Sequence, residues 1–166
     1  MKKEHPLLKF YTYIRKLFDK PKFSELPEEL RVLSSVKYDN YINSFPYKSD
    51  KLKGLLDKTS SITHFLDTTS TTDRDCDDYA RMWSAWLLYN NYQEVYEIII
   101  TEPRYFFSKS HFITIGKKSD RNYVLCNYHM YRNFSSFENA LNKMKSSYPN
   151  YIYTIYRLFT KDSLEA

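Results

Sequence analysis

The fold is decided by one stretch, Asp73-Arg74-Asp75-Cys76-Asp77-Asp78-Tyr79-Ala80, which continues as Arg81-Met82-Trp83-Ser84-Ala85-Trp86-Leu87-Leu88-Tyr89. It is typical of an α-helix that has a cysteine on its first turn. Asp75 is a favourable N-cap, because its carboxylate can accept hydrogen bonds from the unpaired N–H groups of that turn. Asp77 and Asp78 follow where the positive end of the helix dipole stabilises carboxylates. We therefore expect a helix that begins at Cys76.

An apolar stripe connects this cysteine with the interior of the protein. Counting from Cys76 at helical spacing gives Ala80, Trp83 and Leu87, which would face a core. The thiol would then lie at the buried end of a helix, where N–H groups lower a thiol pKa and stabilise an oxyanion. A small buried cysteine that happens to begin a core helix explains the same pattern. Residue chemistry alone favours neither interpretation.

Composition limits the class of protein. A chain of 166 residues, of which 42% are hydrophobic, is long enough for one domain with a core. Its two cysteines cannot form a disulfide framework, and a reactive thiol needs a reducing compartment. Lys9 and Arg15 interrupt the N-terminal apolar stretch, so neither a signal peptide nor a transmembrane helix is predicted. We expect a cytoplasmic protein without a membrane partner.

The net charge of +5 raises the question of nucleic acid. Much of the positive charge lies in the first 22 residues, where basic residues alternate with apolar residues at helical spacing. This pattern predicts an amphipathic helix from Pro6 to Asp19 that exposes its polar face to solvent. Binding of nucleic acid or of a membrane surface is the less favoured interpretation of the charge.

The chain is predicted to form a single domain in three parts. Residues 1–57 are expected to be helical, residues 58–75 to form an irregular segment, and residues 76–166 to form a catalytic core. After the central helix the apolar period changes to that of strands, which are expected at 94–100, 111–115, 122–128 and 151–159. A helix opens at Ser135 before the last strand. This order predicts an α+β fold, in which N-terminal helices and a central cysteine-bearing helix pack on an antiparallel β-sheet.

A nucleophilic cysteine needs a base within hydrogen-bond reach and a third group that orients this base. His111 is the best candidate among the four histidines, because it begins a strand. It shares a face with Ile113 and Ile115, and we expect this face to look toward the central helix. His64 and His129 are the substitutes.

The orienting group depends on the register of the predicted hairpin. One register, which pairs Ile115 with Tyr123, brings Asn127 opposite His111. A slip of one residue brings Cys126 there instead. Both registers leave an apolar face, so the pattern leaves both open. Chemistry favours Asn127, because an amide oxygen accepts a hydrogen bond from an imidazole N–H and a thiol accepts one poorly.

These residues carry a resemblance to a known family. The stretch Arg74-Asp75-Cys76-Asp77-Asp78-Tyr79-Ala80 is similar to the GDCEDYA motif of bacterial transglutaminase-like cysteine proteinases, within the wider papain-like superfamily. Upstream, the resemblance includes Asn40-Tyr41-Ile42-Asn43 and Tyr47-Lys48-Ser49-Asp50, which are similar to the family's N-x-x-[VI]-N and Y-x-x-D stretches. Downstream, it includes His111-Phe112-Ile113-Thr114-Ile115 and Val124-Leu125-Cys126-Asn127, which resemble the catalytic-histidine strand and the V-L-D-N strand. It covers the chain from Val36 to Tyr128.

The resemblance implies a papain-like or transglutaminase-like core with a Cys-His-Asp triad. Cys76 would be the nucleophile and His111 the base. It also implies a calcium ion near the acidic residues Asp75, Asp77 and Asp78. Capping and dipole compensation account for the same carboxylates without a metal, and the chemistry of a thiol hydrolase requires no cofactor.

The chain departs from the family pattern at two positions. Arg74 replaces the glycine of the motif, and Cys126 stands where the family has the aspartate of the triad. Either Asn127 serves as the third residue of the triad, which gives a Cys-His-Asn arrangement as in papain, or the triad is incomplete.

The predicted function is that of a thiol hydrolase, with a cysteine peptidase as the preferred class and a protein or peptide as the substrate. Cys76 would attack a carbonyl carbon and form an acyl-enzyme, and His111 would protonate the leaving amine. The Cys76 N–H would stabilise the oxyanion, with Asn43 and Asp75 in support. The alternative is a catalytically degraded fold that serves as a protein-interaction or virion-associated module.

Overall fold

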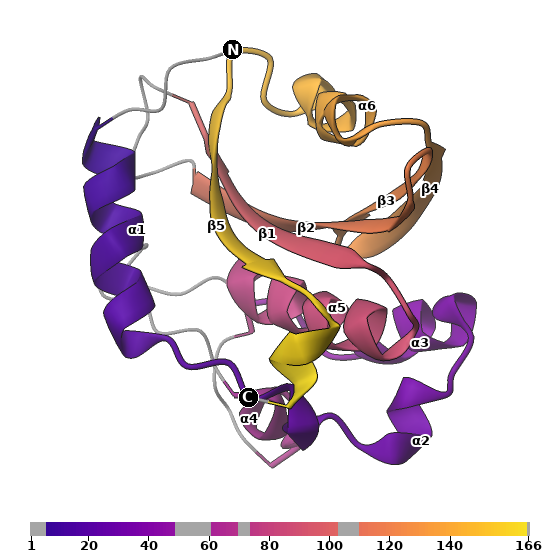
Figure 1. The fold of residues 1–166 in the computed structure, drawn as a ribbon. Coiled ribbons are helices and arrows are strands. Elements are labelled where there is room, and N and C mark those ends of the chain that lie inside the picture. The colour runs from indigo at the N-terminus through magenta and orange to yellow at the C-terminus, as the bar shows by residue number, and fades with distance from the viewer. Residues whose placement is uncertain (1–5, 49–60, 70–73, 103–109, 166) are drawn as a thin grey trace.

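The structure, a computed structural model, describes residues 6–48, 61–69, 74–102 and 110–165. Its centre is a five-stranded sheet in the order β4-β3-β2-β1-β5, in which neighbouring strands are antiparallel (Figure 1). The strands are β1 (Glu94–Thr101), β2 (Ser110–Ser119), β3 (Asn122–Asn127), β4 (His129–Phe134) and β5 (Ile152–Phe159). Ile98, Ile99 and Ile100 of β1 are all fully buried, because this strand is covered on both faces of the sheet.

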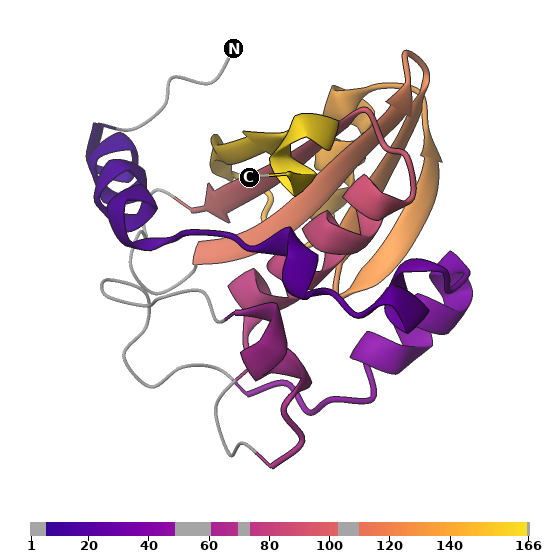
Figure 2. The same cartoon turned by 60° about the horizontal axis from the view of Figure 1, so that its bottom comes forward.

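Helix α5 (Cys76–Tyr89) covers one face of the sheet and is buried along most of its length (Figure 2). Thr114 of β2 donates its hydroxyl to the carbonyl of Ala80 at 2.9 Å. Farther along β2, Gly116 allows close approach, because a Cβ atom there would lie 3.0 Å from Cδ1 of Leu87. The predicted packing of the sheet on the cysteine-bearing helix is confirmed.

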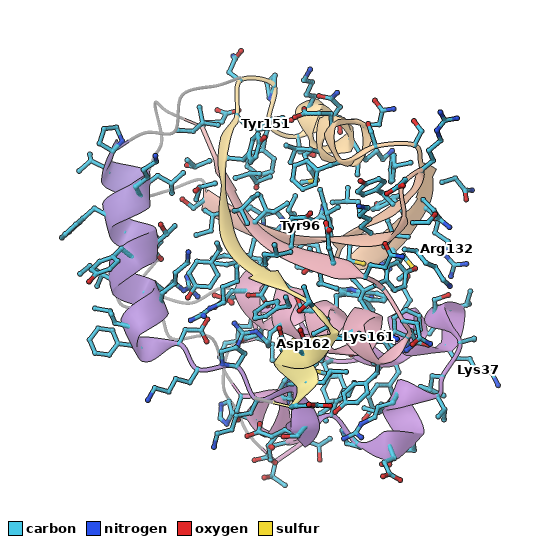
Figure 3. The ribbon with its side chains drawn as sticks, viewed as in Figure 1. Lys37, Tyr96, Arg132, Tyr151, Lys161 and Asp162 are labelled. Carbon is cyan, nitrogen blue, oxygen red and sulfur yellow. The ribbon has the colours of Figure 1, made fainter. Side chains whose placement is uncertain are left out.

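Helix α6 (Phe137–Asn142) and the 3₁₀ helix η3 (Lys143–Ser146) cover the opposite face. The buried side chains between them and the sheet are Ile98, Ile100, Ile113, Ile115, Leu125, Ala140, Leu141, Met144 and Tyr151. Tyr96 lies on the same side (Figure 3). The sheet therefore separates α5 from α6, and the predicted α+β class is confirmed.

The remaining helices are α1 (Pro6–Phe18), η1 (Phe23–Glu25), α2 (Glu28–Arg31), α3 (Ser35–Ile42), α4 (Ile62–Leu66) and η4 (Lys161–Leu164). Of the part predicted to be helical, residues 6–48 contain α1, η1, α2 and α3, and residues 49–57 lie outside the described residues. Tyr38 of α3 is fully buried and donates its hydroxyl to the carbonyl of Met82 at 2.7 Å, which attaches this part to α5. In the described part of the chain, no helix combines the length and the apolarity needed to cross a bilayer.

Helix α1 packs with a different side from the one that its sequence predicts. Leu8, Thr12 and Arg15 are buried against the domain. The side chains that are between 53% and 70% exposed are Leu7, Phe10, Tyr13, Leu17 and Phe18. The expected exposure of the polar face holds for Lys9 and Lys16, whereas Arg15 is buried and the apolar side chains named above lie in solvent.

Buried charges explain this orientation of α1. Arg15 forms an ion pair with Asp77 of α5. Just after the helix, Asp19 lies 2.7 Å from Nη2 of Arg81, whose Nε lies 2.8 Å from Glu97 of β1. All five side chains are buried. Because removing one partner would leave a buried charge unpaired, this network fixes the helix by its charged side.

The segment expected to be irregular contains α4, which Ser61 caps with its side chain. Arg74 then folds back onto this helix. Its Nε donates to the carbonyl of Phe65 and its Nη2 to that of Asp67, both at 2.7 Å. The expectation of an irregular segment is wrong for residues 62–66, and residues 58–60 and 70–73 lie outside the described residues. Arg74, where the resembling motif has glycine, has a structural role in this chain.

Strand β4 is an edge strand that the sequence does not predict. Four of its residues are exposed, so it lacks the apolar alternation that marks the other strands. Tyr128 connects it to β3 with a positive φ of 60°, between the paired residues Asn127 and His129. The tight turn places the end of β3 beside the beginning of β4.

Candidate active site

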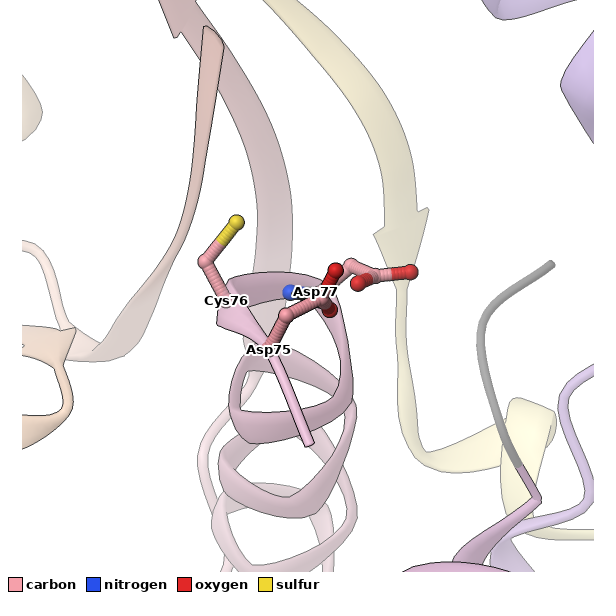
Figure 4. A group of neighbouring side chains, drawn as sticks. All are labelled: Asp75, Cys76 and Asp77. Carbon is pink, nitrogen blue, oxygen red and sulfur yellow. Dashed lines mark hydrogen bonds between the residues drawn. The ribbon is translucent and has the colours of Figure 1, made fainter. Parts of the chain in front are cut away.

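Cys76 lies on the first turn of α5, as predicted. The Asp75 carboxylate accepts a hydrogen bond from the backbone N–H of Asp77 at 3.3 Å. The Asp78 carboxylate accepts one from the backbone N–H of Asp75 at 3.2 Å. This capping box explains why the helix begins at the cysteine. The sulfur of Cys76 and the carboxylates of Asp75 and Asp77 leave the turn in different directions (Figure 4).

The sulfur of Cys76 lies against β2. It packs on an apolar cluster that includes Ile99 and Phe112, and the backbone N–H of Phe112 forms a hydrogen bond with it. Burial raises the pKa of Cys76 well above its ordinary value, and the carboxylates of Asp77 and Asp75 raise it further. The expectation that the helix terminus lowers this pKa is wrong, because desolvation of the thiolate outweighs the favourable groups.

His111 is the second residue of β2 and is buried. Its Nε2 lies 2.5 Å from Oδ1 of Asn127. The ring of Tyr148 stacks on the imidazole, with 5.9 Å between the centroids and 7° between the planes. Burial lowers the pKa of His111, and the hydrogen bond with Asn127 acts in the opposite direction. The structure therefore brings His111 and Asn127 together, as predicted.

The strand register that allows this contact differs from both predicted registers. Ile115 lies opposite Leu125 and not opposite Tyr123. The pairing is shifted by two residues, and a shift of two leaves each side chain on its original face. Asn127 consequently shares a face with His111 and reaches it diagonally.

Cys126 points to the other face of the sheet. It is 1% exposed and belongs to the apolar cluster that contains Trp83 and Leu87 of α5. Burial raises its pKa well above the ordinary value. Cys126 is therefore a core residue, although it occupies the position of the aspartate in the resembling motif.

Cys76 and His111 lie on opposite faces of the sheet, near the beginning of β2. Ile113 and Ile115, which share the face of His111, pack on the side of α6. The expectation that this face looks toward α5 is wrong. The sulfur instead contacts the N–H of Phe112, the residue that follows the histidine. Within residues 74–102 and 110–165, no hydrogen bond joins the sulfur of Cys76 to the imidazole of His111.

Three tyrosines surround these groups, and of these only Tyr47 belongs to a stretch that carries the resemblance, the one similar to Y-x-x-D. The Tyr128 centroid lies 5.4 Å from that of His111 and 5.2 Å from that of Tyr47. The hydroxyls of Tyr47 and Tyr128 share a hydrogen bond. Burial raises the pKa of both tyrosines and of Tyr148, and negative charge on Cys76 raises all three. For Tyr128 and Tyr148 the sequence offers only the number of tyrosines, seventeen, which marks no position.

Asn43, the predicted support for an oxyanion, holds the turn after β3. Its Nδ2 donates to Oδ1 of Asp39 at 2.7 Å and to the carbonyl of Tyr128 at 3.1 Å. Nε1 of Trp83 donates to the same carbonyl at 2.9 Å. These two donors stabilise the left-handed conformation of Tyr128 and so the position of the neighbouring Asn127. The role of Asn43 at an oxyanion stays a prediction.

The acidic residues around the cysteine have structural partners. Asp77 forms the buried ion pair with Arg15, and Asp75 and Asp78 form the capping box. One ligand atom from each of Asp75, Cys76 and Asp77 lies within 4.8 Å of the others. The contacts explain the acidic run without a metal, so calcium binding stays a prediction.

The substitute histidines lie elsewhere. His129 has a 63% exposed side chain, and its Nδ1 lies 2.9 Å from Oδ1 of Asp39. His64 lines a cavity of about 510 Å³ between the end of α1, α4 and α5. The residues that line this cavity include neither Cys76 nor His111.

The candidate site combines three elements: α5 supplies Cys76, β2 supplies His111 and β3 supplies Asn127. His111 and Asn127 meet where β2 begins and β3 ends, and Cys76 packs on the other face of the sheet, against the cluster that contains Phe112. Comparisons with models of protein families, with curated proteins and with solved structures find no match to this chain.

Proposed function

We propose that this chain is a thiol hydrolase of the cysteine peptidase class, in which Cys76 is the nucleophile, His111 the base and Asn127 the orienting group. One observation carries the proposal: Nε2 of His111 lies 2.5 Å from Oδ1 of Asn127, and Cys76 packs on the cluster that contains Phe112, the residue that follows this histidine. Acyl transfer by a thiol requires an imidazole that a third group orients and that the thiol can reach.

The hydrogen bond determines which ring nitrogen acts as the base. An amide oxygen only accepts hydrogen bonds, so Nε2 of His111 carries the hydrogen of the neutral ring. Nδ1 then keeps its lone pair and can take the proton of a thiol. Burial lowers the pKa of His111 and raises that of Cys76, so the resting pair is a neutral imidazole and a neutral thiol. Proton transfer therefore accompanies the attack on the substrate.

The reaction balances with these groups and water. The sulfur of Cys76 adds to the carbonyl carbon of a peptide while Nδ1 of His111 takes the thiol proton. The carbon–nitrogen bond breaks, and the imidazolium gives this proton to the leaving amine. Water then hydrolyses the thioester, which releases the acid and restores the thiol. The backbone N–H of Cys76, at the positive end of α5, stabilises the oxyanion.

Catalysis requires a local rearrangement. The thiol of Cys76 must turn from the N–H of Phe112 toward Nδ1 of His111. Tyr47 is 50% exposed and shares a hydrogen bond with Tyr128, so it is the side chain whose movement admits a substrate. Both cysteines are free thiols, which suits a reducing cytoplasm, and the substrate is a protein or peptide.

A second function, that of a protein-interaction module without activity, is favoured by a different observation. The sulfur of Cys76 has no hydrogen bond with the imidazole of His111 in the described residues, and its pKa is raised. A thiol in this state is a poor nucleophile unless a base removes its proton. The two functions therefore differ in whether His111 activates Cys76.

The test compares alkylation of the two cysteines by iodoacetamide at neutral pH, followed by peptide mass spectrometry. We expect Cys76 to react faster than Cys126, and His111→Ala to slow Cys76 by about tenfold or more, because a general base is lost. The matched control is His129→Ala, which removes an exposed histidine and leaves the rate unchanged. Equal rates in the parent and in His111→Ala contradict the hydrolase and support the module.

A further inference from the structure

The outer side of α1 is an exposed apolar surface, here called the outer stripe. It consists of Leu7, Phe10, Tyr13, Leu17 and Phe18, which are 53%, 65%, 62%, 54% and 70% exposed. Intervals of three, three, four and one residue place these side chains along one side of a helix. Leaving this much apolar surface in water is unfavourable, and such patches mark interaction sites.

The position of the helix keeps the stripe accessible. Leu8, Thr12 and Arg15 hold α1 to the domain by its inner side. Figures 1 and 2 show α1 at the side of the molecule, where its outer side faces no labelled helix or strand. The buried pair between Arg15 and Asp77 opposes a rotation that would bring the stripe inward, because it would break a buried ion pair.

The charges beside the stripe are positive. The exposed charged residues from Pro6 to Lys22 are Lys9, Lys16, Lys20 and Lys22. Between Pro6 and Lys22 the acidic residue is Asp19, whose carboxylate is buried in an ion pair with Arg81. A basic border beside an apolar stripe complements a surface that is both anionic and apolar, and an anionic bilayer has this combination.

The area of the outer stripe argues against a second copy of the chain or a protein groove as its binding partner. A helix of 13 residues is about 20 Å long and about 10 Å wide, so the stripe covers roughly 200 Å². A stable dimer needs about 800 Å² from each partner, and two copies of this stripe would bring lysines of equal charge together. A protein groove surrounds much of a bound helix, but half of α1 is already packed. A bilayer takes such a half-exposed helix flat in its interface.

We propose that the outer stripe of α1 and its lysine border dock the protein on an anionic phospholipid surface. The stripe would enter the boundary between head groups and acyl chains, and Lys9 and Lys16 would contact lipid phosphates. This is attachment to a membrane surface and not a span of the bilayer. It does not depend on the activity of Cys76.

The test is co-sedimentation of the full chain with vesicles. One set contains phosphatidylcholine and phosphatidylglycerol, and the other contains phosphatidylcholine alone. We expect binding to the anionic vesicles that weakens with salt, because charged lysines contribute. The double substitution Phe10→Asp with Leu17→Asp should weaken binding by about tenfold or more, because both apolar contacts are lost. Lys9→Gln and Lys16→Gln should each weaken it by about fivefold.

The matched control is Val32→Asp, since Val32 is an 82% exposed apolar residue outside α1. It should bind as the parent does. Tryptophan fluorescence of the buried Trp83 and Trp86, together with the alkylation rate of Cys76, checks that the Phe10→Asp, Leu17→Asp chain is folded. Equal binding to both vesicle types, or full binding by the folded double variant, overturns the proposal. So does a dimer in solution that the double variant dissociates, because the stripe would then bind a second copy.

Discussion

The imidazole of His111 and the amide of Asn127 lie 2.5 Å apart, although the two residues are not opposite each other in the sheet. The β2–β3 ladder ends at the pair of Thr114 and Cys126, so no ladder pair fixes Asn127 to β2. The contact depends on side chains that lean toward each other along one face. It is therefore sensitive to substitution in a way that the backbone pairing is not.

Asn127→Ala should leave Nε2 of the buried His111 without its partner. An unsatisfied buried donor costs about 1–3 kcal/mol, and urea unfolding should show a loss of this size. The alkylation rate of Cys76 should fall as well, because the orientation and tautomer of the base are no longer fixed. Asn127→Asp should keep the contact and raise the pKa of His111, because a carboxylate stabilises the imidazolium. Loss of stability without any change in alkylation would make Asn127 a structural residue only.

Tyr148→Ala should raise the pKa of His111 toward its ordinary value. Burial is the main cause that lowers this pKa, and the Tyr148 ring covers one face of the imidazole. Removal of the ring admits water, which stabilises the charged form. The measurement is an NMR titration of the His111 ring protons. Tyr148→Phe keeps the ring and is the matched control, so an equal shift in both variants would assign the effect to the hydroxyl.

Some of this site follows from the sequence because the relevant signals are local. The N-cap at Asp75 is set by residues within one turn, and it locates Cys76 in the fold. The contact of His111 with Asn127 follows from the two-residue alternation of strands, which survives a register error of two. Local patterns therefore place each group on the correct element and bring the histidine and the amide to one face.

Other features could not be predicted because they depend on packing between distant elements. Which face of β2 meets α5 is decided by whole layers, and Ile113 would be buried on either side. The orientation of α1 is decided by Arg15, whose partner Asp77 lies 62 residues away. The raised pKa of Cys76 reflects burial by several elements, whereas a helix terminus alone would lower it.

Arg81→Ala should be among the most destabilising substitutions in this chain. The guanidinium is the partner of both Asp19 and Glu97, and all three side chains are buried. Its removal leaves the buried Glu97 without this cation and leaves Asp19 with Arg157, whose Nε lies 3.6 Å away, at a cost of about 3–5 kcal/mol in the free energy of unfolding. Chemical denaturation measures this loss. Lys117→Ala is the control, because Lys117 also pairs with two carboxylates but near the surface, and its loss should change stability little.

The raised pKa of Cys76 predicts a dependence of stability on pH. An unfolded thiol has a pKa of about 8.5, and the folded value lies above it. Between the two values the folded chain holds a proton that the unfolded chain has lost, so this contribution is complete below about pH 8.5 and declines as pH rises. The difference in unfolding free energy between the parent and Cys76→Ser should therefore be constant up to that pH. Above it, the free energy of unfolding of the parent should fall relative to that of Cys76→Ser, by up to about 1.4 kcal/mol per pH unit.

Cys126→Ser should show the same trend, because burial also raises the pKa of Cys126. Using differences between variants removes the contribution of buried tyrosines such as Tyr38 and Tyr156, whose pKa values are also raised by burial. If the trend is present for Cys126→Ser but absent for Cys76→Ser, the Cys76 thiol ionises as readily in the folded chain as in the unfolded one. That result would replace the neutral resting pair by a thiolate–imidazolium pair. Alkylation of Cys76 would then be fast well below pH 8.5, and the base would act before the substrate arrives.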